Sequence, residues 1–368
     1  MIKPASSICN MKCGYCFYCD IAKNREHASY GMMSEDTLER AVKVALAYSS
    51  RDCTIAFQGG EPTLRGLDFF NKLIGCQKKH NVNNVRIHNA IQTNGFKLGE
   101  EFIKFFAEHS FLTGISLDGS RDTHDAYRKT PFGDDTFFNV IETINLFKRH
   151  GAEFNILTVV NGRTGKKAEK IYSFYKKNCF NYLQFIACLD PLNEAPGNYG
   201  HSLTPEVYGS FLCELFDLWH EDLQNGRQPY IRQFENYIGI LLGMGAESCD
   251  MLGVCGRQYV VEADGSVYPC DFYVLPEYRL GNLNFDSLDK IDENRNKIGF
   301  IKYSSSIRDN CKPCEFYRIC RGGCRRHRLI DAGDGSVRNY FCVAYKKFFG
   351  YALGRMLMIA ERVKRGMR

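Results

Sequence analysis

The sequence lacks the features of a secreted, membrane-spanning or repetitive protein. The segment Met1–Asn10 contains one lysine and no apolar run, so we expect no signal peptide. The longest uncharged apolar stretches, such as Tyr237–Ala246, are too short to span a bilayer. Tandem repeats and low-complexity segments are missing as well. With 44% hydrophobic and 24% charged residues among 368, the chain is predicted to be a soluble globular protein of the cytoplasm, with no membrane partner.

A basic stripe of the kind that follows nucleic-acid phosphates is also missing. The formal net charge is +6, but the basic residues are scattered apart from short runs such as Arg325–Arg328. We therefore expect no nucleic-acid partner. Histidines such as His88, His124 and His201 have no spacing typical of metal ligands, and we assign them no role.

Cysteine, in contrast, is abundant, with 17 residues. Many cysteines often indicate a disulfide scaffold, but such scaffolds are short secreted chains with small cores. A cytoplasmic chain of this length has neither property. We therefore expect the thiols to bind metal or to take part in chemistry.

Up to about residue 225, short apolar runs alternate with helical stretches, a pattern typical of an α/β fold. Ser34 before two acidic residues and Thr204 before Pro205 indicate helix starts. The alternation predicts a parallel sheet with right-handed crossovers, either an open doubly wound sheet or a partial barrel. The predicted strands are Met1–Pro4, Thr54–Phe57, Val85–Ile91, Leu112–Leu117, Phe154–Val160 and Leu183–Ala187.

After about residue 240 the cysteines become dense, glycines are frequent and the predicted strands are short. The pair Asp264-Gly265 predicts a tight hairpin between Tyr259–Glu262 and Ser266–Tyr268. A final helix is predicted over Val343–Arg362. Because the region has little continuous apolar pattern, we expect bound metal to supply part of its folding free energy.

The first cysteine cluster has the spacing C-x3-C-x2-C and follows the first predicted strand. Cys9, Cys13 and Cys16 can hold three corners of an iron–sulfur cubane and leave the fourth iron open. An open coordination position distinguishes a catalytic metal site from a structural one. A structural zinc site usually has four ligands, and no histidine lies nearby in the sequence to complete one.

This motif, with Tyr15 before its third cysteine, resembles the signature of radical S-adenosylmethionine (radical SAM) enzymes. The resemblance implies a partial (β/α)6 TIM-type barrel, which we assign to residues 1–235. It implies that the open iron binds SAM, which is cleaved to a 5′-deoxyadenosyl radical. It also implies cofactor-binding residues: a glycine motif that contacts the SAM amino group, two ribose-contacting positions and one residue packed on adenine. These are Gly59, Gly60 and Glu61, then Ser116 and Asp118, and Leu189.

Eight further cysteines resemble the ligand set of the SPASM domain, which is appended to peptide-modifying radical SAM enzymes. The resemblance implies a domain over residues 236–342, followed by a C-terminal helix over 343–368. It further implies two auxiliary 4Fe–4S clusters with no open site, three clusters in all. Spacing alone would place Cys311 through Cys324 on one cluster, and two zinc sites would use the same soft thiolates. The implied ligand sets are Cys249, Cys255, Cys270 and Cys324 for one cluster, and Cys311, Cys314, Cys320 and Cys342 for the other.

Longer matches, including Phe57–Leu64, Gln92–Gly95 and Asp264–Tyr273, resemble the anaerobic sulfatase-maturating enzymes. That family oxidises one Cys or Ser of a Cys/Ser-x-Pro-x-Arg motif in a sulfatase to Cα-formylglycine. The implied partners are an unfolded or nascent sulfatase polypeptide and a low-potential electron donor of the flavodoxin or ferredoxin type.

The same resemblance assigns roles to three polar residues. Asp271 directly follows a cluster ligand and occupies the position of the catalytic base, for which a carboxylate is suitable. Gln58 and Tyr18 match substrate-binding positions near the reacting side chain. The auxiliary clusters would accept the electron that leaves the substrate.

Two other functions are compatible with parts of this pattern. Another SPASM enzyme could form a thioether or a cross-link in a ribosomal peptide. A non-catalytic electron carrier could hold three clusters, but it has no use for an open corner or for the glycine pair. Cys19, three residues after Cys16, is expected to be a bystander rather than a ligand.

Overall fold

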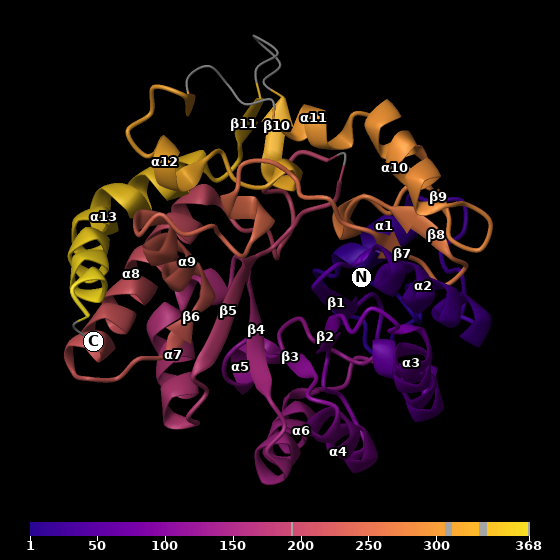
Figure 1. The fold of residues 1–368 in the computed structure, drawn as a ribbon. Coiled ribbons are helices and arrows are strands. Elements are labelled where there is room, and N and C mark those ends of the chain that lie inside the picture. Colours follow the sequence, from indigo (N-terminus) through magenta and orange to yellow (C-terminus); the bar gives the residue numbers. More distant parts are fainter. Residues whose placement is uncertain (193, 306–310, 331–336, 367–368) are drawn as a thin grey trace. The chain divides into compact units, whose positions relative to one another are not determined.

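A computed structural model describes residues 1–192, 194–305, 311–330 and 337–366 of the chain (Figure 1). The chain divides into two compact units. Unit 1 comprises residues 1–117, 124–156 and 257–298, and unit 2 comprises residues 118–123, 157–256 and 299–368. The units interleave along the sequence, so residues far apart in the chain belong to one unit.

Six strands form one sheet in the order of the sequence. The pairs β1–β2, β2–β3 and β5–β6 are parallel, as the alternating pattern predicted. Within the described residues β1 and β6 are the two edges of the sheet, so the barrel is not closed. The strands are β1 (Asp52–Phe57), β2 (Arg86–Thr93), β3 (Leu112–Ser116), β4 (Phe154–Val160), β5 (Tyr182–Ala187) and β6 (Tyr230–Ile231).

The first and last strands of the sheet differ from the prediction. The segment Met1–Pro4 is not a strand; only Ile2 pairs, in isolated parallel bridges to Phe57 and to Val261. Pro4 has no amide hydrogen to donate, which limits how far such pairing can extend. The sixth strand is instead Tyr230–Ile231, and two residues are too few to show a period of two.

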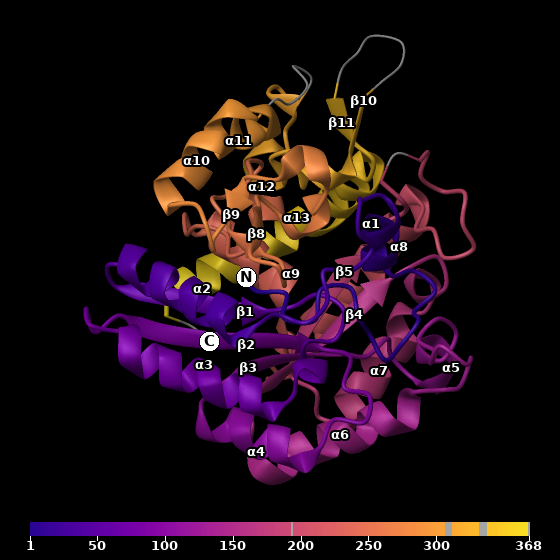
Figure 2. The same cartoon turned by 90° about the vertical axis from the view of Figure 1, so that its right-hand side faces the viewer.

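Unit 1 contains six helices of at least seven residues, and Figure 2 shows three of them, α2, α3 and α4, alongside β1 to β3. The predicted start of α2 is confirmed, because the side chain of Ser34 accepts a hydrogen bond from the amide of Thr37. Phe70 packs edge-on against Phe57 and Phe111 in the buried core. The helices are α1 (Phe17–Lys23), α2 (Glu35–Tyr48), α3 (Leu67–His80), α4 (Glu100–Glu108), α6 (Phe137–His150) and α10 (Leu288–Lys297).

Unit 1 also contains the predicted hairpin, in which β7 (Val260–Val261) pairs antiparallel with β8 (Ser266–Tyr268). Gly265 in its turn has φ +85°, and a Cβ there would lie 2.6 Å from Nδ2 of Asn284, so the turn requires glycine. The third strand of this small sheet is β9 (Gly281–Asn282). Unit 1 also contains the short helical turns η1 (Pro62–Arg65), η4 (Asp271–Tyr273) and η5 (Pro276–Tyr278). The one-turn helix α5 (Arg121–His124) begins in unit 2 and ends at the first residue of the next unit 1 segment.

In unit 2 the C-terminal helix α13 (Cys342–Lys364) packs along α8 (Pro205–Gln224) and α9 (Arg232–Leu241) (Figure 1). It begins one residue before the predicted start. The predicted cap of α8 is confirmed: Thr204 accepts a hydrogen bond from the amide of Val207. The remaining elements are η2 (Thr164–Lys166), α7 (Ala168–Lys177), η3 (Cys249–Met251), α11 (Phe300–Ser304), α12 (Tyr317–Cys320), η7 (Arg325–His327), β10 (Arg328–Ile330) and β11 (Val337–Asn339).

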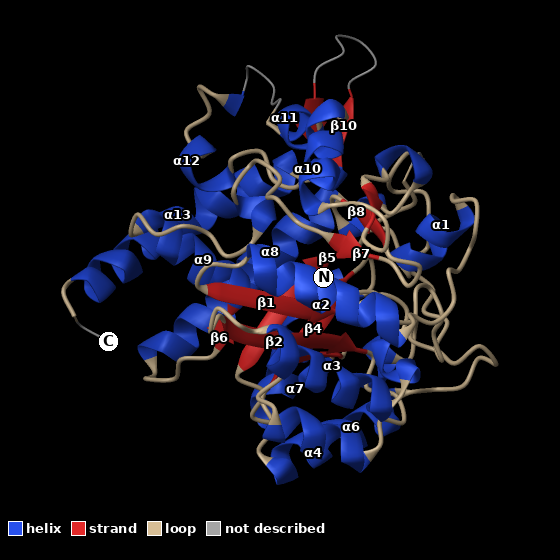
Figure 3. Cartoon of the chain, turned by 45° about the vertical axis from the view of Figure 1, so that its right-hand side comes forward, coloured by secondary structure: helices blue, strands red, loops and turns tan. Residues whose placement is uncertain are grey.

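Figure 3 shows how short the elements between α10 and α13 are, compared with the helices around the six-stranded sheet. None of the helices in the described part of the chain combines the length and the apolarity of a membrane-spanning segment.

Candidate active site and metal centres

The N-terminal cysteine loop of unit 1 is held by backbone hydrogen bonds to a distant segment of the same unit. The amide of Lys12 donates to the carbonyl of Lys129 at 2.8 Å, and the amide of Gly14 donates to that of Tyr127 at 2.9 Å. The ring of Tyr15, the aromatic residue of the motif, packs edge-on against Tyr127. Cys16 is the N-cap of α1. The loop is therefore ordered by the chain itself.

The environment of Cys16 favours the thiolate, which is the form that binds metal. A hydrogen bond from the Cys19 side chain lowers the pKa of Cys16 to about 6, despite burial, and backbone amides and the charge of Arg128 also lower it. Burial raises the pKa of Cys9 to about 11, and the nearby charge of Cys16 contributes to that rise. The same contact with Cys16 raises the pKa of Cys19, so Cys19 remains a neutral thiol and a hydrogen-bond donor to Cys16.

The glycine pair after β1 lies against the residues just before Cys9, where the amide of Gly60 donates a hydrogen bond to the carbonyl of Ser6 at 2.8 Å. A Cβ on Gly60 would lie 2.0 Å from the carbonyl oxygen of Ile8, and a Cβ on Gly59 would lie 2.8 Å from that of Ser6. Gly59 also has φ +130°, which side chains disfavour. In the structure, the atoms nearest to a Cβ at either glycine therefore belong to the residues just before Cys9.

Glu61 is fully buried, and its carboxylate is surrounded by donors from the chain. Oε1 accepts hydrogen bonds from Thr63 and Thr93, and Oε2 accepts one from the amide of Asn94 at 2.8 Å. Asn94 in turn donates to Sγ of Cys9 at 3.5 Å. Burial raises the pKa of Glu61, and these hydrogen bonds oppose the rise. The Glu61 side chain thus joins the loops after β1 and β2 to the cysteine loop.

Asp271, Tyr18 and Gln58 lie in hydrogen-bonding contact in unit 1. Oδ2 of Asp271 accepts a hydrogen bond from the Tyr18 hydroxyl and another from Nε2 of Gln58 at 3.0 Å. Asp271 begins η4, Tyr18 lies in α1, and Gln58 directly follows β1. Burial and the neighbouring carboxylate raise the pKa of Tyr18 well above its usual value, so this phenol remains a neutral donor.

The remaining predicted SAM contacts lie at the ends of strands. Ser116 is the last residue of β3 in unit 1 and is half-buried. Asp118 in unit 2 is fully buried, and its Oδ1 accepts a hydrogen bond from the amide of Val159 at 2.9 Å. Leu189 follows β5 in unit 2 and is half-buried. At least one oxygen of Asp118 is therefore engaged by the chain itself.

The later cysteines of unit 2 influence one another in two separate sets. Burial raises the pKa of Cys320 to about 11, and the charges of Cys342, Cys311 and Cys314 add to the shift. These are the cysteines that the resemblance groups with Cys320, although Cys324 is nearer in the sequence.

Cys324 has different neighbours. Burial raises its pKa to about 12, and the charges of Asp250, Cys249 and Cys255 add to the shift. Cys270, the fourth member implied for this set, lies in unit 1 between β8 and η4. Across residues 1–192, 194–305, 311–330 and 337–366, no three His, Cys, Asp or Glu side chains are close enough to share a single metal ion.

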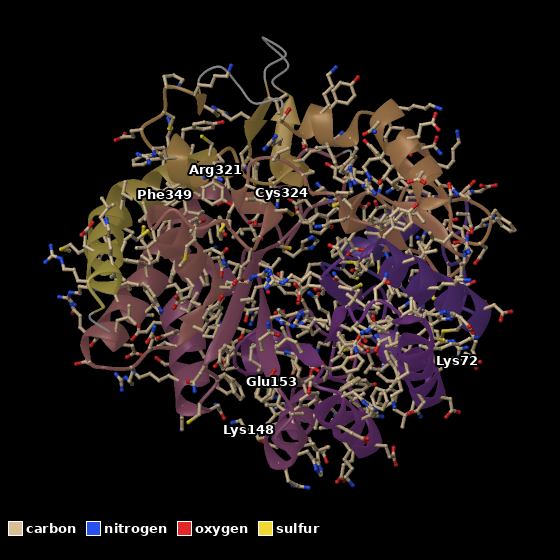
Figure 4. The ribbon with its side chains drawn as sticks, in the orientation of Figure 1. Lys72, Lys148, Glu153, Arg321, Cys324 and Phe349 are labelled. Atoms are coloured by element: carbon tan, nitrogen blue, oxygen red, sulfur yellow. The ribbon has the colours of Figure 1, made fainter. Side chains whose placement is uncertain are left out.

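Arg328 is a structural residue that the sequence analysis missed. Its guanidinium donates to the backbone carbonyls of Gly253, Gly322, Gly323 and Ser304. These carbonyls belong to segments that carry or flank Cys255, Cys320 and Cys324, in the region of Cys324 and Arg321 in Figure 4.

The other two arginines of the same basic run also bind backbone. Arg325 donates to the carbonyl of Phe300 at 2.9 Å, and Arg326 donates to that of Asp190 at 2.6 Å. A run of arginines in the sequence gave no sign of this role, because the carbonyls it binds are scattered along the chain.

Comparisons with known proteins agree with these features. Residues 4–175 match the radical SAM superfamily, and residues 249–316 match the iron–sulfur cluster-binding SPASM domain. The chain is 46% identical over 364 residues to the cysteine-type anaerobic sulfatase-maturating enzyme of Clostridium perfringens, covering 99% of this chain and 98% of that one. It is 33% identical to the serine-type anaerobic sulfatase-maturating enzyme of Bacteroides thetaiotaomicron, covering 95% and 88%. The solved structure of native anSMEcpe with bound AdoMet and Kp18Cys peptide superposes with a TM-score of 0.93 at 46% identity, covering 98% of each chain.

Proposed function

Because the chain belongs to the anaerobic sulfatase-maturating enzymes, a radical SAM family with a SPASM domain, we propose that it oxidises a cysteine of a sulfatase polypeptide to Cα-formylglycine. The observation that carries the proposal is the 46% identity along 99% of the chain. Cysteine rather than serine is proposed as the preferred target, because the serine-type relative is only 33% identical.

The donor chemistry of the chain fits the cofactors of this family. Three thiols on one ordered loop, Cys9, Cys13 and Cys16, suit a 4Fe–4S cluster that also binds SAM. The SAM contacts are proposed at Gly59, Gly60, Glu61, Ser116, Asp118 and Leu189. The two auxiliary clusters are proposed at the ligand sets that the family pattern assigns, and the mutual pKa effects of the unit 2 cysteines support this grouping.

When bound, SAM would supply the acceptor for one hydrogen atom of the substrate Cβ, and the auxiliary clusters would supply the acceptor for the second electron. The chain has to remove the remaining thiol proton, and Oδ2 of Asp271 is proposed to accept it. Tyr18 and Gln58 both donate to that oxygen and so hold it in place. Water then replaces sulfur, which leaves as hydrogen sulfide, and the product is an aldehyde.

The other proposed partners follow from this chemistry. SAM cleavage needs a strong reductant, so a low-potential donor of the flavodoxin or ferredoxin type is proposed. The cytoplasm is proposed as the compartment, because a nascent or unfolded sulfatase is available there.

An anaerobic assay tests the function directly. The reconstituted protein is incubated with SAM, a reductant and a peptide that contains Cys-x-Pro-x-Arg, beside a matched Ser-x-Pro-x-Arg peptide. We expect 5′-deoxyadenosine and an aldehyde at the cysteine, captured with a hydrazine and located by mass spectrometry, with a slower reaction at serine. Uncleaved SAM would contradict radical SAM chemistry, whereas cleaved SAM with an unchanged peptide would contradict the substrate and favour another peptide modification.

The base role has its own test. Asp271→Asn keeps the shape of the side chain but removes the proton acceptor, so formylglycine formation should fall by about 10²-fold or more while SAM is still cleaved. The control is Asp68→Asn on the exposed face of α3, which should behave as the wild type. Wild-type product formation by Asp271→Asn would rule out this base.

A further inference from the structure

A chain of four buried charged side chains ends at Asp271. Lys3 is 2% exposed, Glu262 is fully buried, and Arg25 and Asp271 are also buried. Nζ of Lys3 lies 3.4 Å from Oε1 of Glu262 and 3.4 Å from Oδ1 of Asp271. Nη1 of Arg25 donates to the same Oε1 of Glu262 at 2.8 Å. Cations and anions therefore alternate in this group, which lies entirely in unit 1.

The two oxygens of Asp271 have different surroundings. Oδ2 accepts the hydrogen bonds from Tyr18 and Gln58. Oδ1 is buried without any hydrogen-bond partner, and the Lys3 ammonium is the cation beside it. A buried carboxylate oxygen without a donor is costly, and the ion pair with Lys3 offsets part of that cost on the Oδ1 side.

The backbone holds Lys3 in this position from both sides. Its own amide donates to the carbonyl of Val261 at 2.8 Å, while the carbonyl of Ile2 accepts from the amide of Gln58 at 3.1 Å. The N-terminal segment thus lies between the residue after β1 and the hairpin strand that precedes Glu262. The Lys3 ammonium also lies 4.4 Å from the centre of the Tyr18 ring. The Lys3 side chain therefore contacts both Asp271 and Tyr18, the residue that donates to Oδ2 of Asp271.

Glu262 in turn anchors Lys3. Burial would raise the pKa of Glu262, but the charges of Lys3 and Arg25 and hydrogen bonds from Arg25 and Ser6 lower it overall. Arg25 is itself held by the hydroxyl of Ser6 at 3.1 Å and by the carbonyl of Ala28 at 2.8 Å. The ammonium of Lys3 is therefore fixed by an ionised partner on the side opposite Asp271.

We propose that Lys3 is a positioning residue for the formylglycine reaction: it holds Oδ1 of Asp271, and so directs Oδ2 toward the substrate, with Glu262 and Arg25 anchoring it. This inference rests on the proposed function. Without the ammonium, Oδ1 has to find another donor, and the carboxylate turns away from Tyr18 and Gln58. Because a displacement of about 1 Å can cost about 10²-fold in rate, a small rotation of the Asp271 carboxylate should slow formylglycine formation while SAM is still cleaved.

The central test measures 5′-deoxyadenosine and formylglycine in the same reaction. In Lys3→Met, which keeps the length of the side chain, formylglycine formation should fall by about 10- to 100-fold, mainly in kcat rather than in the peptide KM. SAM cleavage should fall much less, so the ratio of 5′-deoxyadenosine to formylglycine rises. Lys3→Arg, which retains the charge, should recover part of the product.

A double variant separates positioning from simple charge neutralisation. In Lys3→Met, the buried Glu262 carboxylate keeps only Arg25 as a cationic partner, which should lower the stability of the folded protein. The double variant Lys3→Met/Glu262→Gln also removes the negative charge of Glu262. We expect the double variant to regain thermal stability but to keep the high ratio. If the double variant restores the wild-type ratio, Lys3 only neutralises Glu262, and the positioning role is wrong.

A matched control and a structural readout complete the test. Lys72→Met on the surface of α3 removes a lysine that pairs with Glu35 and Glu39, and it should leave both products unchanged (Figure 4). A crystal structure of Lys3→Met should show that Oδ2 of Asp271 has lost its contact with Nε2 of Gln58. An unchanged carboxylate, or an unchanged product ratio, would overturn the role of Lys3.

The outcomes also distinguish this inference from the function on which it rests. A wild-type enzyme that cleaves SAM but makes no formylglycine overturns the proposed function and this role together. A wild-type enzyme that makes formylglycine, beside a Lys3→Met variant with the same ratio, overturns only the role of Lys3.

Discussion

The cysteine loop of unit 1 and the cysteine-rich segment of unit 2 are supported in different ways. The loop from Cys9 to Cys16 receives backbone hydrogen bonds, side-chain donors and close glycine contacts from residues that adjoin or support the strands of a large sheet. In the described residues 311–330 and 337–342, the helices are short and the strands β10 and β11 form a two-stranded sheet. Two glycine carbonyls of this segment and two carbonyls of neighbouring segments in unit 2 accept hydrogen bonds from the guanidinium of Arg328.

This difference shows two ways to preorganise thiolates. Where a large core exists, the chain can order a ligand loop before metal arrives and can leave one coordination position open. Where the core is small, we expect bound metal to supply part of the folding free energy. We therefore expect the two regions to respond differently to the loss of one ligand.

The largest predicted effect comes from removing one cysteine in each region. Cys13→Ala should abolish SAM cleavage and all product, because the proposed SAM-binding cluster is lost. Cys314→Ala should still cleave SAM but form little formylglycine, because the auxiliary cluster proposed to accept the second electron loses a ligand. The measurements are 5′-deoxyadenosine, formylglycine and iron content. If Cys314→Ala abolishes SAM cleavage as completely as Cys13→Ala, the two regions are not functionally separate.

A smaller effect is predicted for Arg328→Met. Losing a cation that binds several buried carbonyls should cost on the order of 3 kcal/mol in this region. Hydrogen exchange should become faster in α12 and η7 while β1 to β3 stay protected, and the auxiliary-cluster signals in electron paramagnetic resonance should weaken. The exposed Arg318→Met is the matched control. Equal exchange in both variants would show that metal alone organises this region.

The smallest predicted effect is that of Ser34→Ala at the start of α2. Loss of the cap should destabilise unit 1 by about 1 kcal/mol without any change in SAM cleavage or product. Thermal unfolding and the anaerobic assay measure the two quantities. A large loss of activity would contradict the view that the sheet scaffold of unit 1 tolerates a small local weakening.

Much of the fold could be predicted from local pattern. Strands β1 to β5, the caps at Ser34 and Thr204, the hairpin at Gly265 and the last helix all depend on residues close together in the sequence. The errors occurred where pairing was too short to leave a pattern. In Met1–Pro4 only Ile2 pairs, in two isolated bridges, and β6 has two residues.

In the candidate site, the residues that belong to sequence motifs could be predicted, and the residues outside such motifs could not. Cysteine spacing and the resemblance indicated the thiols and Asp271, because their motifs are contiguous or regularly spaced. Lys3 and Arg328 belong to no such motif. A single lysine near the N-terminus or an arginine in a basic run looks like an ordinary surface residue until its partners are known.

By itself, the sequence determined the α/β class, the family and the chemical nature of the metal ligands, because these depend on periodicity, spacing and residue type. Only the tertiary structure decided which buried charges meet, which oxygen of Asp271 faces Lys3, and which carbonyls Arg328 binds. Such contacts join residues up to hundreds of positions apart, and their energies depend on burial and distance, which a linear pattern does not contain.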